Sequence, residues 1–319
     1  MTAAPAAPAG PGALLVVGDV VTDVVAVHAE PLAPGTDTPA RIRTLPGGAG
    51  ANAACWAAHA GAREVRLLAR VGADSAGWHE RALLDAGVRP TLVVDPAEPT
   101  GTVVALVGAD AERTFLTDSG ASLRLSPADW EPGLLDGVAH LHLSGYLFFA
   151  DASRELALVA LRAARARNVP VSVDPASAGF LAALGPQRFL AAAAGAGVLL
   201  PNEDEALLLA GAPGPAGATG AAGPPERAAA VARAAAELSR RVPLVVVTRG
   251  GAGALIAEDG RVTAEVAAES AEAVDSTGAG DAFTGAFLAA RLAGAGSAWA
   301  AGAGCRAAAL AVARLGGRP

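Results

Sequence analysis

The chain has 319 residues, of which 52% are hydrophobic, enough to bury one large core or two modest ones. Its net charge of -7 excludes a broad nucleic-acid-binding surface, because such a surface needs clustered positive charge. All 24 basic residues are arginines, which excludes P-loop NTPases, protein kinases and pyridoxal-phosphate enzymes, because each of these classes depends on a lysine.

The start of the chain and its two cysteines indicate a cytoplasmic protein. Residues 1–12 are mainly Ala, Pro and Gly and lack the segments of a signal peptide, so we expect a disordered tail before one domain over 13–319. No run reaches the roughly 18 apolar residues that span a bilayer, so we expect no membrane partner. Cys55 and Cys305 provide neither a disulfide framework nor a paired metal-ligand spacing, which favours a reducing compartment.

The order of the predicted elements indicates an α/β fold. Short runs of branched residues alternate with alanine-rich stretches, a pattern typical of a parallel sheet with helices on both faces. The predicted strands are 14–17, 65–69, 140–143, 169–173, 198–200 and 243–248. The predicted helices are 51–60, 76–86, 153–168, 203–210, 225–241, 279–293 and 297–315.

Two segments interrupt this alternation, at residues 31–45 and 100–117. The second predicts a hairpin that turns around residues 108–112. Because both segments precede elements of the main sheet, we expect them to form a small β lid over its edge. Residues 211–225, GAPGPAGATGAAGPP, predict an exposed loop and lack the strict triplet repeat of collagen.

Residues 274–287, VDSTGAGDAFTGAF, combine an anion site with a carboxylate. The small residues Gly278, Ala279 and Gly280 allow a tight turn into a helix whose first N–H groups point at one spot. Asp281 would accept a proton from a nucleophilic hydroxyl while these N–H groups take up charge on a transferring phosphoryl group. Taken alone, the same residues also fit an ordinary helix cap.

Four motifs resemble those of the ribokinase-like (PfkB) carbohydrate kinases. DSTGAGDAF at 275–283 resembles D-T-x-G-A-G-D, and GGAGANAA at 47–54 meets G-G-x-x-x-N-x-A. PNEDE at 201–205 resembles N-x-x-E, and TRGGAG at 248–253 resembles T-x-G-x-x-G after a predicted strand. Since all four occur in the family's order and cover nearly the whole chain after the tail, the chain is identified as a member of this family. The resemblance implies a ribokinase-like three-layer α/β sandwich with a small β lid.

The resemblance also implies an ATP- and Mg²⁺-dependent kinase that phosphorylates a hydroxyl of a small sugar or sugar acid. Asp281 would be the catalytic base, and the backbone of Gly278, Ala279 and Gly280 the anion hole. Residues on the acceptor side would bind sugar hydroxyls through carboxylate and amide groups. These are Asp23, less readily Asp19, and with them Gly47, Gly48 and Asn52.

The nucleotide and metal side is implied in the same way. Asn202 and Glu205 would hold Mg²⁺ through water, although the pair also fits a helix cap. The residues that would line the nucleotide phosphates, in what alone would be a plain β-turn, are Thr248, Gly250 and Gly253. Asp275 and Thr277 could help to form a K⁺ site, and because the chain ends at RLGGRP we expect some C-terminal ligands of that site to be lacking.

Other polar residues leave two interpretations each. Arg113 in the lid motif AERTF, and Arg249 in the phosphate-side turn, would meet substrate or phosphate, or would be solvated arginines. His140 and His142 share a face of a predicted strand, but without a third ligand nearby a structural or substrate-wall role is favoured over zinc.

Departures from the family pattern bear on the substrate. Ala49 stands where true ribokinases have a lysine, and Ser144 and Gly145 stand where they have a glutamate, which argues against ribose. The motifs look closer to those of kinases of hexoses or keto-sugar acids, and Arg113 would pair with the carboxylate of an acid.

Alternative functions stay open at this point. A nucleoside kinase of the same fold is disfavoured by an aromatic content of 4%. A non-catalytic sugar- or nucleotide-binding protein is disfavoured because a sensor has no use for a base. A nicotinamide oxidoreductase would need GxGxxG after the first strand, where residues 18–23 read GDVVTD. Pairing of lid edges between subunits would give a homodimer.

Overall fold

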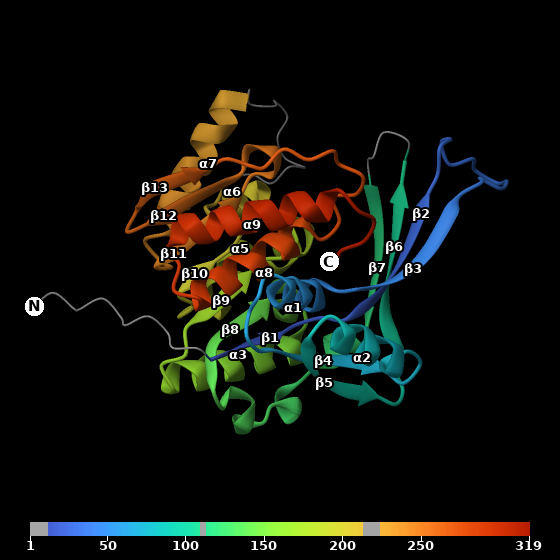
Figure 1. Ribbon diagram of the computed structural model, residues 1–319, viewed down its shortest axis with the longest axis horizontal. Coiled ribbons are helices and arrows are strands. Elements are labelled where there is room, and N and C mark those ends of the chain that lie inside the picture. Colours follow the sequence, from blue (N-terminus) through green and yellow to red (C-terminus); the bar gives the residue numbers. More distant parts are fainter. Residues whose placement is uncertain (1–11, 109–112, 213–223) are drawn as a thin grey trace, which may run out of the picture.

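The computed structural model describes residues 12–108, 113–212 and 224–319. Within these residues the chain forms an α/β body and a smaller β sheet that stands beside it (Figure 1). The large sheet has the strand order β13-β12-β11-β10-β9-β8-β1-β4-β5, and the small sheet has the order β3-β2-β6-β7. The expected α/β architecture with a small β lid is confirmed.

The large sheet is parallel except at one edge. β1 pairs in parallel with β4 and β8, whereas β12 runs antiparallel to both β11 and β13. Every residue of β1 is buried, as expected for a central strand covered by helices on both faces. The strands are β1 (Ala13–Val17), β4 (Val65–Gly72), β5 (Val88–Asp95), β8 (Val138–Ser144), β9 (Val171–Asp174), β10 (Val198–Leu199), β11 (Leu244–Thr248), β12 (Ala254–Glu258) and β13 (Arg261–Val266).

Side chains that alternate along β1 enter two separate cores, one on each face of the sheet. Leu14 belongs to the core that contains Phe287, and Leu15 belongs to the core that contains Leu156. The first core is covered by α1 (Ala49–His59), α2 (Ala76–Asp85), α8 (Ala279–Leu292) and α9 (Ser297–Val312). The second is covered by α3 (Asp151–Ala166), α4 (Ala178–Leu184), α5 (Pro186–Ala192), α6 (Glu203–Leu209) and α7 (Pro224–Leu238).

The small sheet is the lid. It consists of β2 (Val21–Val27), β3 (Arg41–Gly47), β6 (Thr100–Val107) and β7 (Arg113–Gly120). β6 and β7 form the antiparallel hairpin predicted over 100–117, and its turn at 109–112 lies outside the described residues. The expectation for 31–45 was wrong in part, because only 41–47 form a strand there. Its partner β2 was missed, since we had interpreted 18–23 only as a sugar-binding turn.

The predicted elements agree with the structure to within three residues at either end. Besides β2, the strands and α-helices that the sequence pattern did not reveal are β5, β12, β13, α4 and α5. α4 and α5 are short helices separated by Gly185, whose φ of 96° prevents one continuous helix. The tail at 1–11 and most of the loop at 211–225 lie outside the described residues.

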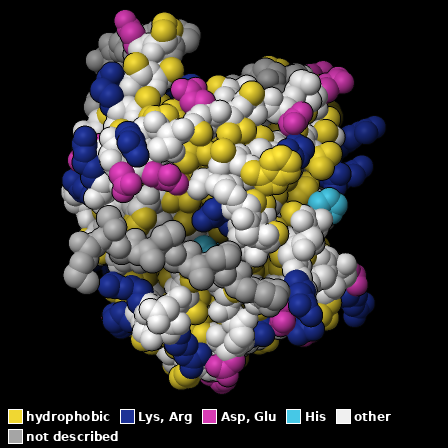
Figure 2. All heavy atoms as spheres, turned by 60° about the vertical axis from the view of Figure 1, so that its left-hand side comes forward, with side chains coloured by type: hydrophobic (Ala, Val, Ile, Leu, Met, Phe, Trp, Pro, Cys, Tyr) yellow, Lys and Arg dark blue, Asp and Glu magenta, His cyan; other side chains and the backbone are white. Residues whose placement is uncertain are grey.

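The surface carries both signs of charge. On the face shown in Figure 2, arginines and acidic side chains are interspersed. Ion pairs within the described residues include Arg227 with Glu203 and Asp204. None of the helices in the described part of the chain has the length and apolar character needed to cross a membrane.

Candidate active site

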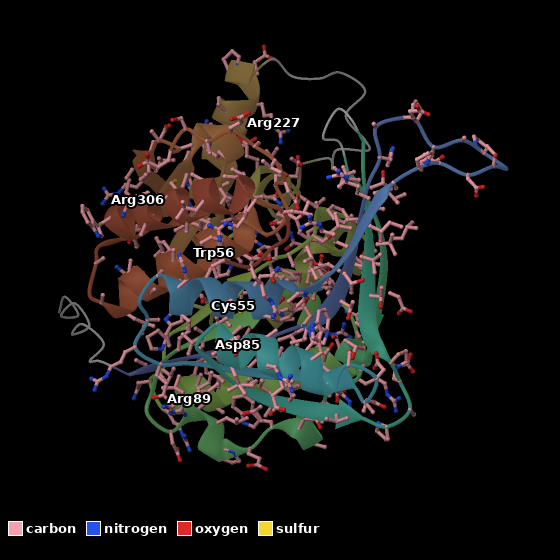
Figure 3. The ribbon with its side chains drawn as sticks, turned by 45° about the vertical axis from the view of Figure 1, so that its right-hand side comes forward. Cys55, Trp56, Asp85, Arg89, Arg227 and Arg306 are labelled. Atoms are coloured by element: carbon pink, nitrogen blue, oxygen red, sulfur yellow. The ribbon has the colours of Figure 1, made fainter. Side chains whose placement is uncertain are left out.

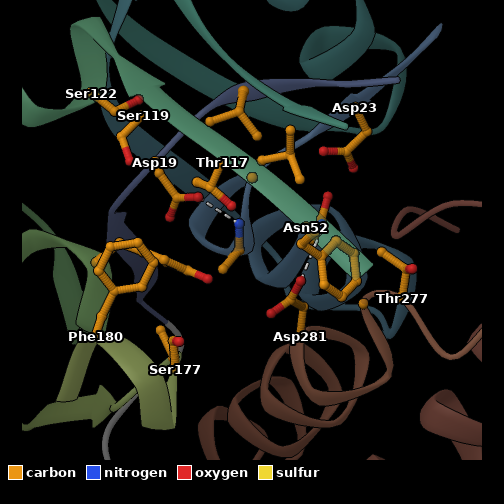
Figure 4. A pocket seen from close by; sticks show the side chains of 18 of the residues that line it. Asp19, Asp23, Asn52, Thr117, Ser119, Ser122, Ser177, Phe180, Thr277 and Asp281 are labelled. Atoms are coloured by element: carbon orange, nitrogen blue, oxygen red, sulfur yellow. Dashed lines mark hydrogen bonds between the residues drawn. The ribbon is translucent and has the colours of Figure 1, made fainter. Parts of the chain in front are cut away.

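A cavity of about 840 Å³ lies between the lid and the carboxyl ends of the central strands (Figure 4). This is the edge at which open α/β sheets bind their ligands. The lid contributes mostly apolar side chains, among them Val25, Val103 and Phe115. The body contributes polar side chains together with apolar ones such as Phe180. The predicted site residues that line the cavity are Asp23 on the lid strand β2 and, from the body, Gly48, Asn52, Asn202, Thr277, Gly278 and Asp281.

Asp281 stands in the first turn of α8 and faces this cavity. The helix begins after Gly278, whose φ is 74°, and a Cβ there would lie 2.4 Å from the Cα of Gly317, so only glycine fits. The amide Nδ2 of Asn52 donates to Oδ2 of Asp281 over 2.9 Å. The GAGD turn and the asparagine of the first glycine motif, 229 residues apart, therefore meet in one site.

Burial raises the pKa of Asp281 well above its usual range. The residue is nevertheless only partly buried and lines the cavity. The hydrogen bond from Asn52 opposes this rise, and the carboxylates of Asp174, Asp19 and Asp23 add to it. A raised pKa strengthens a carboxylate as a proton acceptor, provided that it is ionised when the substrate hydroxyl arrives. The Asn52 donor favours that ionised form.

The start of α8 leaves room for an anion. The residue at its N-cap position is Gly278, which has no side chain with which to cap the helix, although the Ala279 N–H already donates to Ser276 O over 3.3 Å. A Cβ built on Gly280 meets nothing within 4 Å. The positive end of the helix dipole therefore faces open space beside Asp281.

Asp23 lies on β2 and is 8% exposed. Burial raises its pKa to about 7, Arg318 opposes the rise, and Asp19 and Asp275 add to it. A Cβ on Gly47 would lie 2.1 Å from Oδ2 of Asp23. Gly47 therefore leaves room for this carboxylate and is not itself part of the cavity wall.

Asp19, the less favoured acceptor residue, serves chiefly as a cap. Its carboxylate accepts hydrogen bonds from the N–H groups of Ala49 (2.8 Å) and Gly50 (3.1 Å) at the start of α1. Ser144 Oγ donates to the same carboxylate over 3.0 Å. Ser144, which departs from the ribokinase pattern, thus helps to join β1, β8 and α1.

Asn202 and Glu205 form the capping box that was the alternative to a metal role. Glu205 N–H donates to Asn202 Oδ1, and Asn202 N–H donates to Glu205 Oε2, each over 2.9 Å. Asn202 also lines the cavity. Glu205 is 2% exposed, and burial together with the Asp174 carboxylate raises its pKa to about 8.

The chemistry of this corner fits a divalent cation. Burial raises the pKa of Asp174 to about 6, and Asp174 and Glu205 repel each other when both are ionised. A cation close to them would stabilise both charged forms. Oxygen donors are the ligands that Mg²⁺ prefers, and this ion commonly binds through its own waters.

The turn at 248–253 lies next to this corner and outside the cavity lining. Thr248 forms an isolated β-bridge with Asn202. Gly253 has a φ of 87°, and a Cβ there would lie 1.9 Å from Val266 O, whereas a Cβ on Gly250 would meet nothing within 4 Å. Arg249 is paired with Glu203 (3.4 Å) and Glu265 (3.1 Å), so it ties the turn to α6 and β13.

The structure places the other candidates as follows. Arg113 begins β7 opposite Val107, and its side chain lies outside the described residues. Asp275 is buried and accepts hydrogen bonds from the N–H groups of Thr277 and Gly316, each over 2.9 Å. The C-terminal segment therefore reaches Asp275 through an N–H donor, which is not a cation ligand, so the expected lack of C-terminal ligands for a K⁺ site stays a prediction.

His140 and His142 belong to the interior. Each forms a hydrogen bond of 2.9 Å with Ser172 Oγ. Burial lowers the pKa of His140 to about 4 and that of His142 to about 3, so both rings are neutral at physiological pH. Of the two interpretations that we favoured, the structural one describes them.

Sequence reasoning missed Asp174, Phe180 and Arg318. Asp174 had a signal, because it ends a buried strand in VSVDP and the carboxyl ends of parallel strands face the ligand. Phe180 lines the cavity together with Tyr146, and no local pattern marked either residue. The Nη2 of Arg318 donates to Gly47 O over 3.0 Å, a contact between residues 271 apart.

Residues 12–319 match the family described as pfkB family carbohydrate kinase. A fructokinase from Klebsiella pneumoniae is 30% identical over 286 residues, which make up 87% of this chain and 84% of the fructokinase. A bifunctional protein HldE from Azorhizobium caulinodans is 36% identical over 95% of this chain, which spans 61% of that relative.

Two solved structures have the same fold. An adenosine kinase from Sinorhizobium meliloti has a TM-score of 0.83 at 21% identity, with 97% of this chain and 96% of that chain covered. A ribokinase II from E. coli, solved in complex with ATP and Mg²⁺, has a TM-score of 0.76 at 24% identity, with 96% and 94% covered. From the match over residues 12–319 and the similarity to fructokinase, we conclude that the chain belongs to the pfkB family of carbohydrate kinases.

Proposed function

We propose that this kinase transfers the terminal phosphoryl group of Mg²⁺–ATP to a hydroxyl of a small sugar-like molecule, with Asp281 as the base. The observation that carries the proposal is Asp281 itself: it faces the cavity beside a helix start that opens onto empty space. A carboxylate would repel a bound phosphate unless a hydroxyl lay between them to give up its proton. The N–H groups from Gly278 onward would then stabilise the charge on the phosphoryl group.

Asp23 and Asn52 would bind the acceptor. Both lie on the cavity wall near Asp281, and a carboxylate beside an amide suits neighbouring hydroxyls, which donate to the first and accept from the second. Asn202 and Glu205 would hold Mg²⁺ through water with Asp174 nearby. When bound, this ion would offset negative charge on the phosphates.

A second cavity of about 620 Å³ would accommodate the nucleotide base. Residues 269–274 line it on one side and α9 on the other, with Val274 and Leu310 respectively 56% and 49% exposed. Exposed apolar side chains of this size fit a flat aromatic ring. Because residues 269–274 lead directly into Gly278, the phosphates of a base held here would extend toward the start of α8.

A nucleoside is a second candidate acceptor, and one observation favours it. The chain has few aromatic residues, yet Phe115, Tyr146 and Phe180 all line the acceptor cavity. Phe180 stacks on Phe149 with ring centroids 5.4 Å apart and meets Tyr146 edge-on. The low overall aromatic content therefore no longer argues against a nucleoside, because the position of the aromatic side chains in the cavity matters more than their number in the chain.

The test is a panel of acceptors with detection of the ADP formed. Neutral hexoses, pentoses, keto-sugar acids and nucleosides would each be supplied with ATP, with and without Mg²⁺. We expect ADP formation to require both Mg²⁺ and one acceptor class. Phe180→Ala should lower kcat/KM for a nucleoside far more than for a free sugar, with Phe189→Ala, in the core, as a variant whose aromatic ring lies elsewhere. Mg²⁺-independent ADP formation, or none with any acceptor, would contradict the proposal.

A further inference from the structure

The C-terminal residues 316–319 pack against Gly47 and Asn52, next to the proposed acceptor site. The chain end lies between the body and the lid (Figure 1). Gly316 N–H donates to Asp275 Oδ2, and Trp56 Nε1 donates to Gly317 O, each over 2.9 Å. Trp56 stands on α1 close to α8 and α9 (Figure 3), and it shares a buried cluster with Ala282 and Ala307. The tail is thus held by buried hydrogen bonds on both sides.

Arg318 connects this tail to the amide that contacts the base. Its Nη2 donates to Gly47 O over 3.0 Å, and its Nε donates to Asn52 Oδ1 over 3.4 Å. The Nδ2 of the same amide donates to Asp281 Oδ2 over 2.9 Å. A Cβ on Gly317 would lie 2.4 Å from Asn52 Nδ2, so glycine at this position allows the amide to lie against the tail.

The Oδ1 and Nδ2 atoms of Asn52 require different partners, because Oδ1 accepts hydrogen bonds and Nδ2 donates them. A guanidinium only donates hydrogen bonds, so it must face Oδ1, and the opposite Nδ2 then points at Asp281. If the amide turned over, Nδ2 would face the guanidinium and Oδ1 would face the carboxylate. In that orientation Oδ1 could only accept a hydrogen bond from the O–H group of protonated Asp281, so it would favour the protonated form, which is no longer a base.

Stability does not explain why Arg318 is here. Burial lowers the pKa of its guanidinium, and its Nη1 is buried without a hydrogen-bond partner among the described residues. Leaving such a donor unsatisfied costs free energy. We propose that Arg318 is a positioning residue for the phosphoryl transfer: its guanidinium fixes the Asn52 amide so that Nδ2 donates to Asp281 and keeps that carboxylate ready to accept a proton. The inference rests on the proposed role of Asp281.

The first test is a double-mutant cycle on kcat. Arg318→Ala should lower kcat about 10- to 100-fold with little change in KM for ATP, because it frees the Asn52 amide that donates to the base and leaves the nucleotide contacts in place. In an Asn52→Ala background the same change should have almost no further effect. Added guanidinium ion should restore part of the activity of Arg318→Ala, since it fills the vacated space. Arg314→Ala is the matched control, because Arg314 is an exposed arginine just before residues 316–319 whose guanidinium lies over the Trp56 ring and has no hydrogen bond to Asn52 among the described residues.

The second test does not depend on turnover, so it separates this inference from the proposed function. The side-chain amide signals of Asn52 in NMR, identified by their loss in Asn52→Ala, should shift as Asp281 titrates and should lose this response in Asp281→Asn. The other carboxylates that act on Asp281 are Asp174, Asp19 and Asp23, and Asp281→Asn separates their influence. We expect the response to persist in Arg314→Ala and to vanish in Arg318→Ala. A persisting response in folded Arg318→Ala, or additive effects in the kinetic cycle, would overturn the inference even if the protein proved to be an active kinase.

Discussion

The first turns of α1 and α8 have similar backbones, but their N–H groups have different partners. Each helix follows a glycine of positive φ, 100° at Gly48 and 74° at Gly278, and the two helices pack so closely that a Cβ on Gly285 would lie 2.4 Å from Ala53 O. At α1, the carboxylate of Asp19 accepts from the first N–H groups. At α8, the N-cap residue Gly278 has no side chain that could do so, and Gly280 faces open space.

The difference shows how the N-terminus of a helix can serve either stability or chemistry. A helix start attracts an anion through its N–H groups and its dipole. Where the protein supplies the anion, as with Asp19, the result is a fixed junction between a strand and a helix. Where it supplies none, we propose that the phosphoryl group of the substrate takes the place, with Asp281 beside it.

The largest expected effect tests the open helix start. Asp281→Asn should lower kcat about 10²- to 10⁴-fold, because the amide cannot accept the hydroxyl proton. Nucleotide affinity, measured by calorimetry, should stay close to that of the wild type. Asp37→Asn, at an exposed loop position, is the control and should leave kcat unchanged. Near-normal turnover by Asp281→Asn would show that Asp281 is not the base, and the start of α8 would then have no catalytic role to distinguish it from the start of α1.

The next effect concerns Asp23, a carboxylate of the same cavity on the lid strand β2. Its pKa is raised to about 7, so folding favours its protonated form, and the stability that this form contributes is lost as the pH rises from about 4 to about 7. The shift corresponds to at most about 4 kcal/mol. Relative to the wild type, Asp23→Asn should therefore gain unfolding free energy over this pH range in denaturant titrations. A difference between the two proteins that stays constant over this pH range would contradict the assigned pKa.

The two glycines of the open turn should respond differently to the same change. Gly278→Ala forces a side chain into a positive φ and against Gly317, so the unfolding free energy should fall by about 1–3 kcal/mol. Gly280→Ala meets no neighbour and should leave stability nearly unchanged while weakening nucleotide binding. Thermal unfolding and nucleotide titration of both variants measure this contrast. Equal loss of stability in the two would show that Gly280 is not open to a ligand.

The smallest effect tests the filled helix start. Asp19→Ala removes the acceptor for the Ala49 and Gly50 N–H groups and should lower the unfolding free energy by about 0.5–2 kcal/mol. Asp19→Asn, which keeps one acceptor oxygen, should lose less. Because the filled start is a structural junction, kcat of the remaining folded protein should fall far less than in Asp281→Asn. A loss of kcat as large as that of Asp281→Asn would place Asp19 in the chemistry.

The fold and the location of the glycine turns were predictable because they depend on local patterns. Buried parallel strands are short apolar runs, and helix starts carry glycine and capping residues close together in the chain. The lid was predicted only in part, because β2 acquires its role as a strand by pairing with β3 and β6. The short α4 and α5 were missed because each is seven residues long, too short for a clear helical period.

By itself the sequence determined the family motifs, the α/β order of the elements and the residues Asp281, Asn202 and Asp23 as candidates for chemistry. Only the tertiary structure decided that Asp19 caps a helix, that Asp174 approaches Glu205, that Phe180 lines the cavity and that Arg318 contacts Asn52. The physical reason is distance along the chain. Hydrogen bonds and burial involve groups that folding brings together from distant parts of the chain, as with Arg318 and Asn52, which are 266 residues apart. A local pattern of residue types cannot predict such a contact.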